Sequence, residues 1–386
     1  MKTEDVLYDE VFSDNKKKLD TLRNELAGDR EWALCLGAGV SISAGLPNWY
    51  GLLAKLTAQI VPQENFKKIS EGDMDIPYYQ GVENFYKNLK DENNFYKKSE
   101  KALNDQYQHV FEGINVLESA EYIRNYLKDD VRRMLGGDEW KEKLLDHRLN
   151  CFIQNICRNV SPVSPDSTLY AVANLVAYSI HNVLTYNYDN LLENCLRDLG
   201  CDPDKIHSIV KEDMLRDFSN TDEWNIYHVH GRIPVDDAHE KMSGRVILTE
   251  SDYYQEENIN YSWTNVLQSY VIARMNVIYI GFSGADYNFR RIIKYMNQEG
   301  NEISHKRYIF FSVDDIANAV FSDKKTGTKK KIEKYLKDDK YAYEKVFINY
   351  LIHAQSVYWK EHGLDVIWSS HEELPGILME LSSAHV

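Results

Sequence analysis

Short apolar runs recur along this chain, and helix-like stretches separate most of them. The runs lie near residues 32–36, 182–186, 225–229, 276–282, 307–312 and 364–368. Strands that alternate with helices form a parallel sheet with right-handed crossovers. The pattern therefore predicts an α/β fold built on a Rossmann-like parallel sheet of about six strands.

A long helical stretch separates the first two predicted strands. Residues 116–127 place apolar side chains near i, i+3, i+4 and i+7, which is the period of an amphipathic helix, and residues 140–157 show a similar pattern. We therefore expect a helical insertion within one domain that spans the chain. We predict a single domain over 1–386, with a Rossmann core of about 29–55 and 160–386 and a helical insertion of about 56–159.

The first predicted strand ends in a glycine-rich turn, Gly37-Ala38-Gly39-Val40-Ser41. Glycine lets a backbone lie close to a bound group. Amide groups at the start of the following helix would then face an anion such as a pyrophosphate. The spacing is not the full G-x-G-x-x-G fingerprint, so this turn alone fits an ordinary strand-to-helix connection equally well.

Polar residues also follow three other predicted strands. They are Thr185, Asn187 and Asp189 after the second, His228 and His230 at the third, and Gly281, Ser283 and Asp286 after the fourth. Ligands of open α/β sheets bind at the carboxyl ends of the strands. Four such ends in one chain favour a binding site over a set of unrelated turns.

In these residues the chain resembles the sirtuin (silent information regulator) family. That family carries Gly-Ala-Gly-Ile-Ser-x-x-x-Gly-Ile-Pro, then Thr-Gln-Asn-Ile-Asp, a catalytic His before Gly, and Gly-x-Ser. The corresponding segments here are 37–47, 185–189, His230-Gly231 and 281–283, in the same order. The resemblance spans roughly residues 30 to 312 and implies that NAD+ binds at the strand ends.

The resemblance also implies roles for individual residues. His230 would be the base that acts through the ribose hydroxyls, and Asn187 would contact the nicotinamide ribose and the attacking water. Asp189 would bind the nicotinamide carboxamide, and Gly281 and Ser283 would face the adenosine part. The remaining residues expected to bind NAD+ are Gly37, Ala38, Gly39, Ser41, Pro47, Asn48, Trp49 and Thr185. The structural alternatives are a strand-end histidine for His230 and an Asx turn for Asp189.

Departures from the family narrow the expected chemistry. Asn48-Trp49-Tyr50 stands where sirtuins have Asp-Phe-Arg, and Tyr186 replaces a glutamine. The five cysteines form no C-x-x-C pair, so the two pairs that hold structural zinc in deacylating sirtuins are missing, and we expect neither a zinc lobe nor any bound metal. The pattern resembles the bacterial antiphage sirtuin-like NADases, in which water takes the ribosyl group. A deacylase or ADP-ribosyltransferase, and a non-catalytic nucleotide-sensing scaffold, remain as alternatives.

Charge and hydropathy limit the partners and the location. The net charge of −15 argues against broad nucleic-acid binding by the chain alone, which needs phosphate-neutralising Lys and Arg. No apolar run reaches the ~18 residues of a membrane span, and the amino end lacks a signal-peptide pattern, so we expect a cytoplasmic protein. The resemblance extends to stand-alone sirtuin-like subunits paired with a HerA-type ATPase. We therefore expect a homo-oligomer with such a partner, acting in abortive infection.

Overall fold

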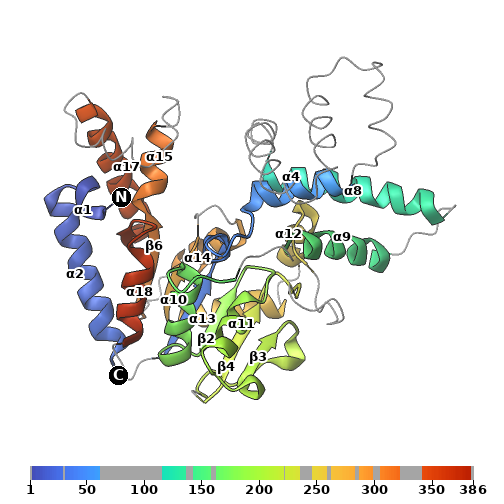
Figure 1. Ribbon diagram of the computed structural model, residues 1–386, viewed down its shortest axis with the longest axis horizontal. Coiled ribbons are helices and arrows are strands. Elements are labelled where there is room, and N and C mark those ends of the chain that lie inside the picture. The colour runs from blue at the N-terminus through green and yellow to red at the C-terminus, as the bar shows by residue number, and fades with distance from the viewer. Residues whose placement is uncertain are drawn as a thin grey trace. The chain divides into compact units, whose positions relative to one another are not determined.

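The computed structural model divides the chain into two compact units (Figure 1). The first comprises residues 1–44, 162–229 and 261–386, and the second comprises 45–161 and 230–260. The residues that the structure describes are 2–28, 31–60, 115–135, 142–157, 162–220, 222–234, 246–258, 262–282, 287–298, 305–321 and 341–383. No helix in these ranges is both long and apolar enough to cross a membrane.

The first unit contains a fully parallel seven-stranded sheet in the order β3-β4-β2-β1-β5-β6-β7. The strands are β1 Trp32–Leu36, β2 Asn182–Thr185, β3 Ile206–Ile209, β4 Trp224–His228, β5 Asn276–Ile280, β6 Arg307–Ser312 and β7 Asp365–Ser369. The central strand β1 has β2, β4 and β3 on one side and β5, β6 and β7 on the other. This confirms the predicted Rossmann-like α/β fold.

The predicted number of about six strands was one too low, because β3 does not have an apolar run. Its four residues include His207 and Ser208, both only half-buried, and it pairs with β4 alone at the edge of the sheet. An edge strand needs fewer apolar side chains than a central one, so its sequence resembles that of a loop.

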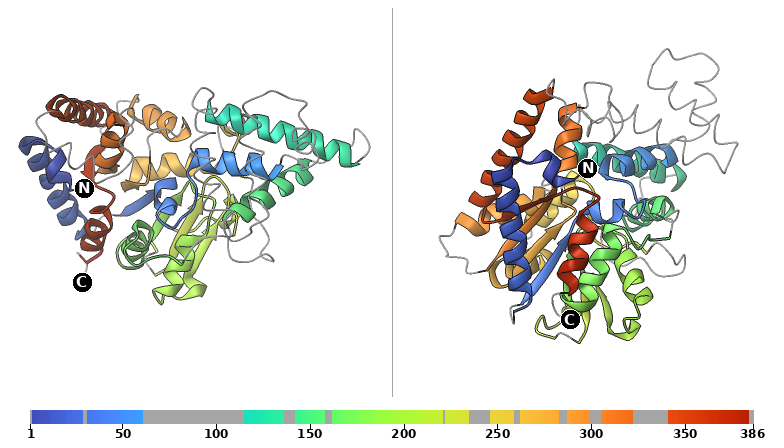
Figure 2. Two further views of the ribbon diagram at one scale, coloured as in Figure 1. Left: turned by 45° about the horizontal axis from the view of Figure 1, so that its top comes forward. Right: turned by 60° about the vertical axis from the view of Figure 1, so that its left-hand side comes forward.

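Helices flank both faces of this sheet (Figure 2). They are α1 Thr3–Val6, α2 Asp9–Leu26, α3 Ala38–Ile42, α10 Thr168–Tyr178, α11 Leu191–Asp198, α13 Trp263–Arg274, α14 Tyr287–Gln298, α15 Val313–Phe321, α17 Ala342–Glu361 and α18 Leu374–Ser382. Helix α10 packs against α11 and α18, and β7 contacts both α2 and α17. The Ser167 hydroxyl caps α10 by accepting a hydrogen bond from the Tyr170 amide at 3.2 Å.

The core of the first unit consists of the strands and the inner faces of these helices. Every side chain of β1 and β5 is buried, as expected for the centre of a parallel sheet. Aromatic rings continue the core outward, since Phe289 contacts Tyr279, Phe282 and Trp359 with ring centroids 4.9 to 5.8 Å apart. The strand ends therefore rest on a rigid base.

The second unit is helical in its described part. Its helices are α4 Trp49–Ile60, α8 Val116–Leu135, α9 Glu142–Cys157 and α12 Glu250–Asn258. Helices α4, α8 and α9 contact one another, and α12 packs on α8, where a buried ion pair joins Arg124 to Asp252 at 2.5 Å. The helices predicted over 116–127 and 140–157 are confirmed. Residues 61–114 of the predicted insertion lie outside the described residues, and the predicted domain limits stay a prediction.

Candidate functional site

The carboxyl ends of four neighbouring strands lie level with one another. Leu36 at the end of β1 is opposite Thr185 of β2 and Ile280 of β5, and Thr185 is opposite His228 of β4. Backbone hydrogen bonds continue past these ends, from the Gly37 amide to the Ile280 carbonyl at 2.9 Å, for example. The chain passes from β1 to β2 on one side, and after β4 it crosses to β5 on the other side of β1. This edge is therefore a topological switch point, where open α/β sheets bind ligands.

The two glycine turns at this edge pack directly against each other. A Cβ on Gly37 would lie 2.5 Å from the Gly281 carbonyl oxygen, and a Cβ on Gly39 would lie 2.8 Å from the Gly281 Cα. Gly281 itself has a φ of +76°, which favours glycine, and its carbonyl accepts from the Gly39 amide at 2.9 Å. The missing side chains thus make room for a neighbouring backbone, a role that the sequence alone did not indicate. Ala38 and Gly39 remain exposed at the surface of the turn.

A chain of hydrogen bonds joins the first turn to the polar residues that follow β2. The Asn187 Nδ2 donates to the Ser41 Oγ at 2.9 Å and to the Gly37 carbonyl at 3.1 Å. The Ser41 hydroxyl in turn donates to the Asp189 Oδ2 at 2.7 Å. Three side chains that the sequence predicted to share a site therefore contact one another directly.

Asp189 lies two residues before helix α11, and its carboxyl group has a raised pKa. Its Oδ1 accepts from the Leu191 amide at 3.2 Å, which is an Asx turn. Burial raises the pKa of Asp189 above its usual value; the nearby Glu193 also raises it, while the hydrogen bonds from Ser41 and Leu191 and the charge of His228 lower it. The structural and functional interpretations of Asp189 are compatible, because one oxygen serves the turn and the other contacts Ser41.

A buried pair that the sequence did not predict lies beneath Asp189. The His228 Nε2 lies 2.9 Å from the Glu193 Oε1, and the Ser208 hydroxyl donates to that same oxygen at 2.6 Å. Glu193 has no exposed surface and His228 is 1% exposed. The available signal in the sequence was His228 alone, the last residue of the apolar run that forms β4.

Four other predicted site residues, Pro47, Asn48, Trp49 and His230, belong to the second unit. His230 is buried, its ring meets that of Tyr253 edge to face at 5.5 Å, and its carbonyl accepts from the Ile247 amide at 3.0 Å. The Asn48 side chain accepts from the Gly51 amide at 2.8 Å and so caps α4, beside the half-buried Pro47 and Trp49. Ser283 and Asp286 lie outside the described residues.

Tyr186, which stands where sirtuins have a glutamine, belongs to the core beneath the site. Its ring packs edge to face on Phe282, with the ring centroids 5.1 Å apart, and its hydroxyl donates to the Gln268 Oε1.

In the part of the chain that the structure describes, no group of three or more His, Cys, Asp or Glu side chains could hold a metal ion. None of the five cysteines forms a disulfide bond, and burial raises the pKa of Cys195 to about 12.

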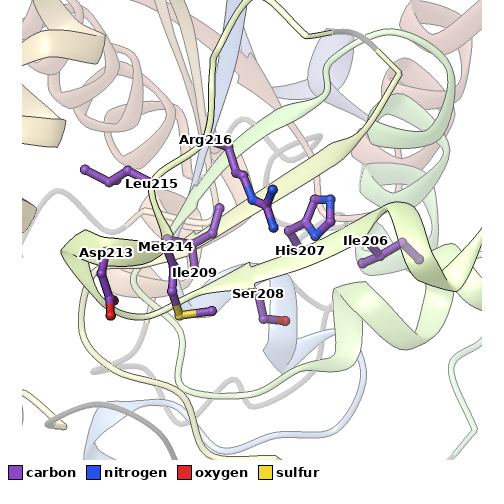
Figure 3. A pocket seen from close by; sticks show the side chains of 8 residues that line it. All are labelled: Ile206, His207, Ser208, Ile209, Asp213, Met214, Leu215 and Arg216. Atoms are coloured by element: carbon purple, nitrogen blue, oxygen red, sulfur yellow. The ribbon is translucent and has the colours of Figure 1, made fainter.

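A hollow of about 430 Å³ lies along the edge strand β3 (Figure 3). It is lined by Ile206, His207, Ser208, Ile209, Asp213, Met214, Leu215 and Arg216. None of these is a predicted site residue, and His207 is paired with Glu223 at 3.1 Å. The candidate site is therefore defined by the strand ends and not by this hollow.

Comparisons with known proteins support the resemblance over part of the chain. Residues 181–343 match the family model of the SIR2-like domain. A stretch of 135 residues is 24% identical to Defense-associated sirtuin 2 of Bacillus subtilis. This stretch covers 35% of this chain and 12% of that protein. The glycine turn at Gly37 lies outside the matched residues 181–343, whereas Asn187, Asp189 and His230 lie within them. The comparisons thus support a sirtuin-like family with a defence-associated member, and the segment that matches the SIR2-like domain carries part of the candidate site.

Proposed function

We propose that this chain is an NAD+ glycohydrolase, which cleaves the nicotinamide–ribose bond and releases nicotinamide and ADP-ribose. The observation that carries the proposal is the hydrogen-bond chain Asn187–Ser41–Asp189 at the switch point of the sheet. It joins amide, hydroxyl and carboxyl groups beside the exposed Ala38–Gly39 turn. Such a set suits a ribose and a carboxamide, both of which need donors and acceptors.

Cleavage of this bond passes through an oxocarbenium-like state. Nicotinamide leaves as a neutral molecule because its ring carries the positive charge in NAD+, so no strong acid is required. The protein must instead hold the ring and the ribose in place and supply a base. In this proposal Asp189 binds the nicotinamide carboxamide and Asn187 orients the ribose and the incoming water.

We assign the base to His230, which follows β4 by two residues along the chain. An imidazole titrates near neutral pH, so it can accept a proton from a ribose hydroxyl or from the attacking water. The water oxygen bonds to the ribose C1 as the bond to nicotinamide breaks, and the remaining proton leaves through His230. The match of residues 181–343 to the SIR2-like domain supports this assignment.

The biological setting is proposed by analogy. The matched relative is named as defence-associated, and NAD+ depletion would stop an infected cell from supporting phage growth. An enzyme of this kind requires control, and we propose that it forms a homo-oligomer with a HerA-type ATPase partner.

The test is an assay of free nicotinamide with purified chain and NAD+, with and without an acetylated peptide. Light scattering of the same sample reports the assembly state. We expect release of nicotinamide that does not depend on the peptide, from a particle larger than one chain. His230→Ala and Asn187→Ala should each lower turnover by about 10²–10⁴-fold, the usual effect of removing a positioned base or orienting group.

The matched control is His207→Ala, which removes a histidine on β3 that is paired with Glu223. It should keep wild-type turnover. Release that requires the acetylated peptide would favour the deacylase alternative. Tight NAD+ binding without any release, alone or with a candidate ATPase, would favour the nucleotide-sensing scaffold.

A further inference from the structure

The Glu193–His228 pair occupies a closed position directly behind the candidate site. Three elements contribute to it: Glu193 from the first turn of α11, His228 from the end of β4, and Ser208 from β3. The carboxylate oxygen Oε1 accepts from Ser208 at 2.6 Å and lies 2.9 Å from the His228 Nε2. Burying two ionisable groups is costly, so a pair retained at this depth needs an explanation.

Both members of the pair are connected to the site residues. The Asp189 Oδ1 accepts from the Leu191 amide, the first residue of α11, at 3.2 Å, and Glu193 lies in the first turn of that helix, so both carboxyl groups lie at the start of α11. His228 lies opposite Thr185 in the sheet, and the Thr185 Oγ1 accepts from the Asn187 amide at 3.1 Å. The pair therefore adjoins Asp189 through the helix and Asn187 through the strand.

Among the described residues of the first unit, the elements next to Asp189 carry few other charged side chains. Helix α3, helix α10 and strand β2 contain no Asp, Glu, Lys, Arg or His. On β3 the only histidine, His207, is paired with Glu223. On α11, Arg197 bonds to Asn194 at 2.7 Å and Asp198 lies at the far end. Within the first unit, Glu193 and His228 are thus the charged groups best placed to influence Asp189.

We propose that Glu193 and His228 are positioning residues that together set whether Asp189 is ionised when it meets the nicotinamide carboxamide. This inference rests on the proposed function of Asp189. A negative charge on Glu193 disfavours the ionised form of Asp189, and a positive charge on His228 favours it. The balance between them decides whether Asp189 accepts a hydrogen bond from the carboxamide or donates one to it.

The two members of the pair should act in opposite directions, which a purely structural role would not produce. In Glu193→Gln, an amide oxygen can still accept from Ser208 and His228, but the negative charge is gone, so the pKa of Asp189 should fall. In His228→Asn, the Glu193 charge loses its cationic partner, so the pKa of Asp189 should rise. We expect opposite shifts of roughly one pKa unit, the size that neighbouring charges typically produce.

The experiment is a pH titration of the Asp189 carboxyl by isotope-edited infrared spectroscopy of ¹³C-aspartate-labelled full-length chain. The band that disappears in the variant Asp189→Asn is the one that belongs to the Asp189 carboxyl. We expect the midpoint to move down in Glu193→Gln and up in His228→Asn, and to stay in place in the control His207→Asn. The acidic limb of the pH profile for nicotinamide release should move in the same two directions.

Midpoints that move together, or that do not move in variants with wild-type thermal unfolding, would overturn the proposal. If His228→Asn does not fold, His228→Gln serves as the second variant. The infrared midpoint does not depend on activity. A chain that releases no nicotinamide but shows the opposite shifts would refute the proposed function and leave the role of the pair intact.

Discussion

At the scale of single residues, Asp189 combines a local structural task with a half-buried carboxyl group of raised pKa. One of its oxygens holds the Asx turn at the start of α11, and the other accepts from Ser41. Burial raises its pKa, so the ionised form is less stable in the folded chain than in the unfolded chain. A residue kept at some cost in stability is typical of a functional site.

We therefore predict that Asp189→Asn stabilises the fold at neutral pH while it impairs NAD+ turnover. The folded chain keeps the Asp189 proton to a higher pH than the unfolded chain does. The wild-type protein therefore loses stability as the pH rises from the unfolded pKa through the folded one. The variant avoids this loss, which amounts to about 1.4 kcal/mol for each unit of pKa shift. Denaturant unfolding across about pH 4 to 8 measures it.

Asp217→Asn provides a control of opposite sign. The backbone and side-chain hydrogen bonds from Ser219 lower the pKa of this exposed carboxyl group. Its removal should lower stability slightly at neutral pH and have no effect on turnover. If Asp189→Asn lowered stability in the same way, the burial cost assigned to Asp189 would be wrong.

The sequence revealed Asn187 and Asp189 but not the pair that lies behind them. Polar residues directly after an apolar run mark a strand end, and the level ends of parallel strands bring them together. Glu193 gave no such signal, because a glutamate in the first turn of a helix is usually a solvated residue that favours the helix dipole. Its burial depends on β3 and β4, whose register only the structure shows.

At the scale of elements, the site depends on the close contact of two strand-to-helix turns. The glycines of the β1–α3 turn leave no space for a side chain against Gly281. The sequence predicted a sharp strand-to-helix turn at these glycines, but not the packing of the turn after β5 against them. A contact between residues about 240 positions apart along the chain cannot be read from a local motif.

We predict that Gly39→Ala displaces the turn after β5 and lowers both stability and NAD+ affinity. The new Cβ would lie 2.8 Å from the Gly281 Cα and 3.0 Å from its carbonyl oxygen, and backbone atoms cannot rotate away as a side chain can. Overpacking of this kind costs about 1–3 kcal/mol. Denaturant unfolding gives the stability, and calorimetric titration with NAD+ on a His230→Ala background gives the affinity.

Gly376→Ala is the matched control. It makes the same change within α18, where a Cβ has no neighbour within 4 Å. It should leave affinity unchanged and raise stability by up to about 1 kcal/mol, because alanine favours a helix. Equal affinity for NAD+ in Gly39→Ala and in its parent would show that the packed glycine turns do not shape the binding site.

At the scale of the whole molecule, hydrogen bonds from distant positions fasten the first helices to the last strand and helix. The Asn15 side chain bonds to both backbone groups of Trp368, with its Nδ2 2.8 Å from the carbonyl oxygen and its Oδ1 2.7 Å from the amide nitrogen. The Asn349 Oδ1 accepts from the Tyr8 amide at 3.0 Å. These contacts hold the first helices against β7 and α17, and sequence patterns gave no indication of them.

Several of these hydrogen bonds meet at the carboxylate of Glu373, the residue directly before α18. Its Oε2 accepts from the Thr3 amide at 3.0 Å, from the Thr3 hydroxyl, and from the amide and hydroxyl of Ser370 at 3.2 and 2.8 Å. Burial alone would raise the pKa of Glu373, but these hydrogen bonds outweigh it and hold the pKa below its usual value. The carboxylate therefore stabilises the fold at neutral pH.

We predict that Glu373→Ala lowers the free energy of unfolding by about 1 kcal/mol at neutral pH, since the group is partly exposed and screened by solvent. The contribution of a carboxyl group with a lowered pKa is present above its unfolded value and disappears as the pH falls through the folded one. The difference between variant and wild type should therefore shrink in acid. Glu380→Ala, which removes an exposed ion pair with Arg23, should change stability far less. An effect of Glu373→Ala that stays constant with pH would mean that the lost contact is packing and not the charged carboxylate.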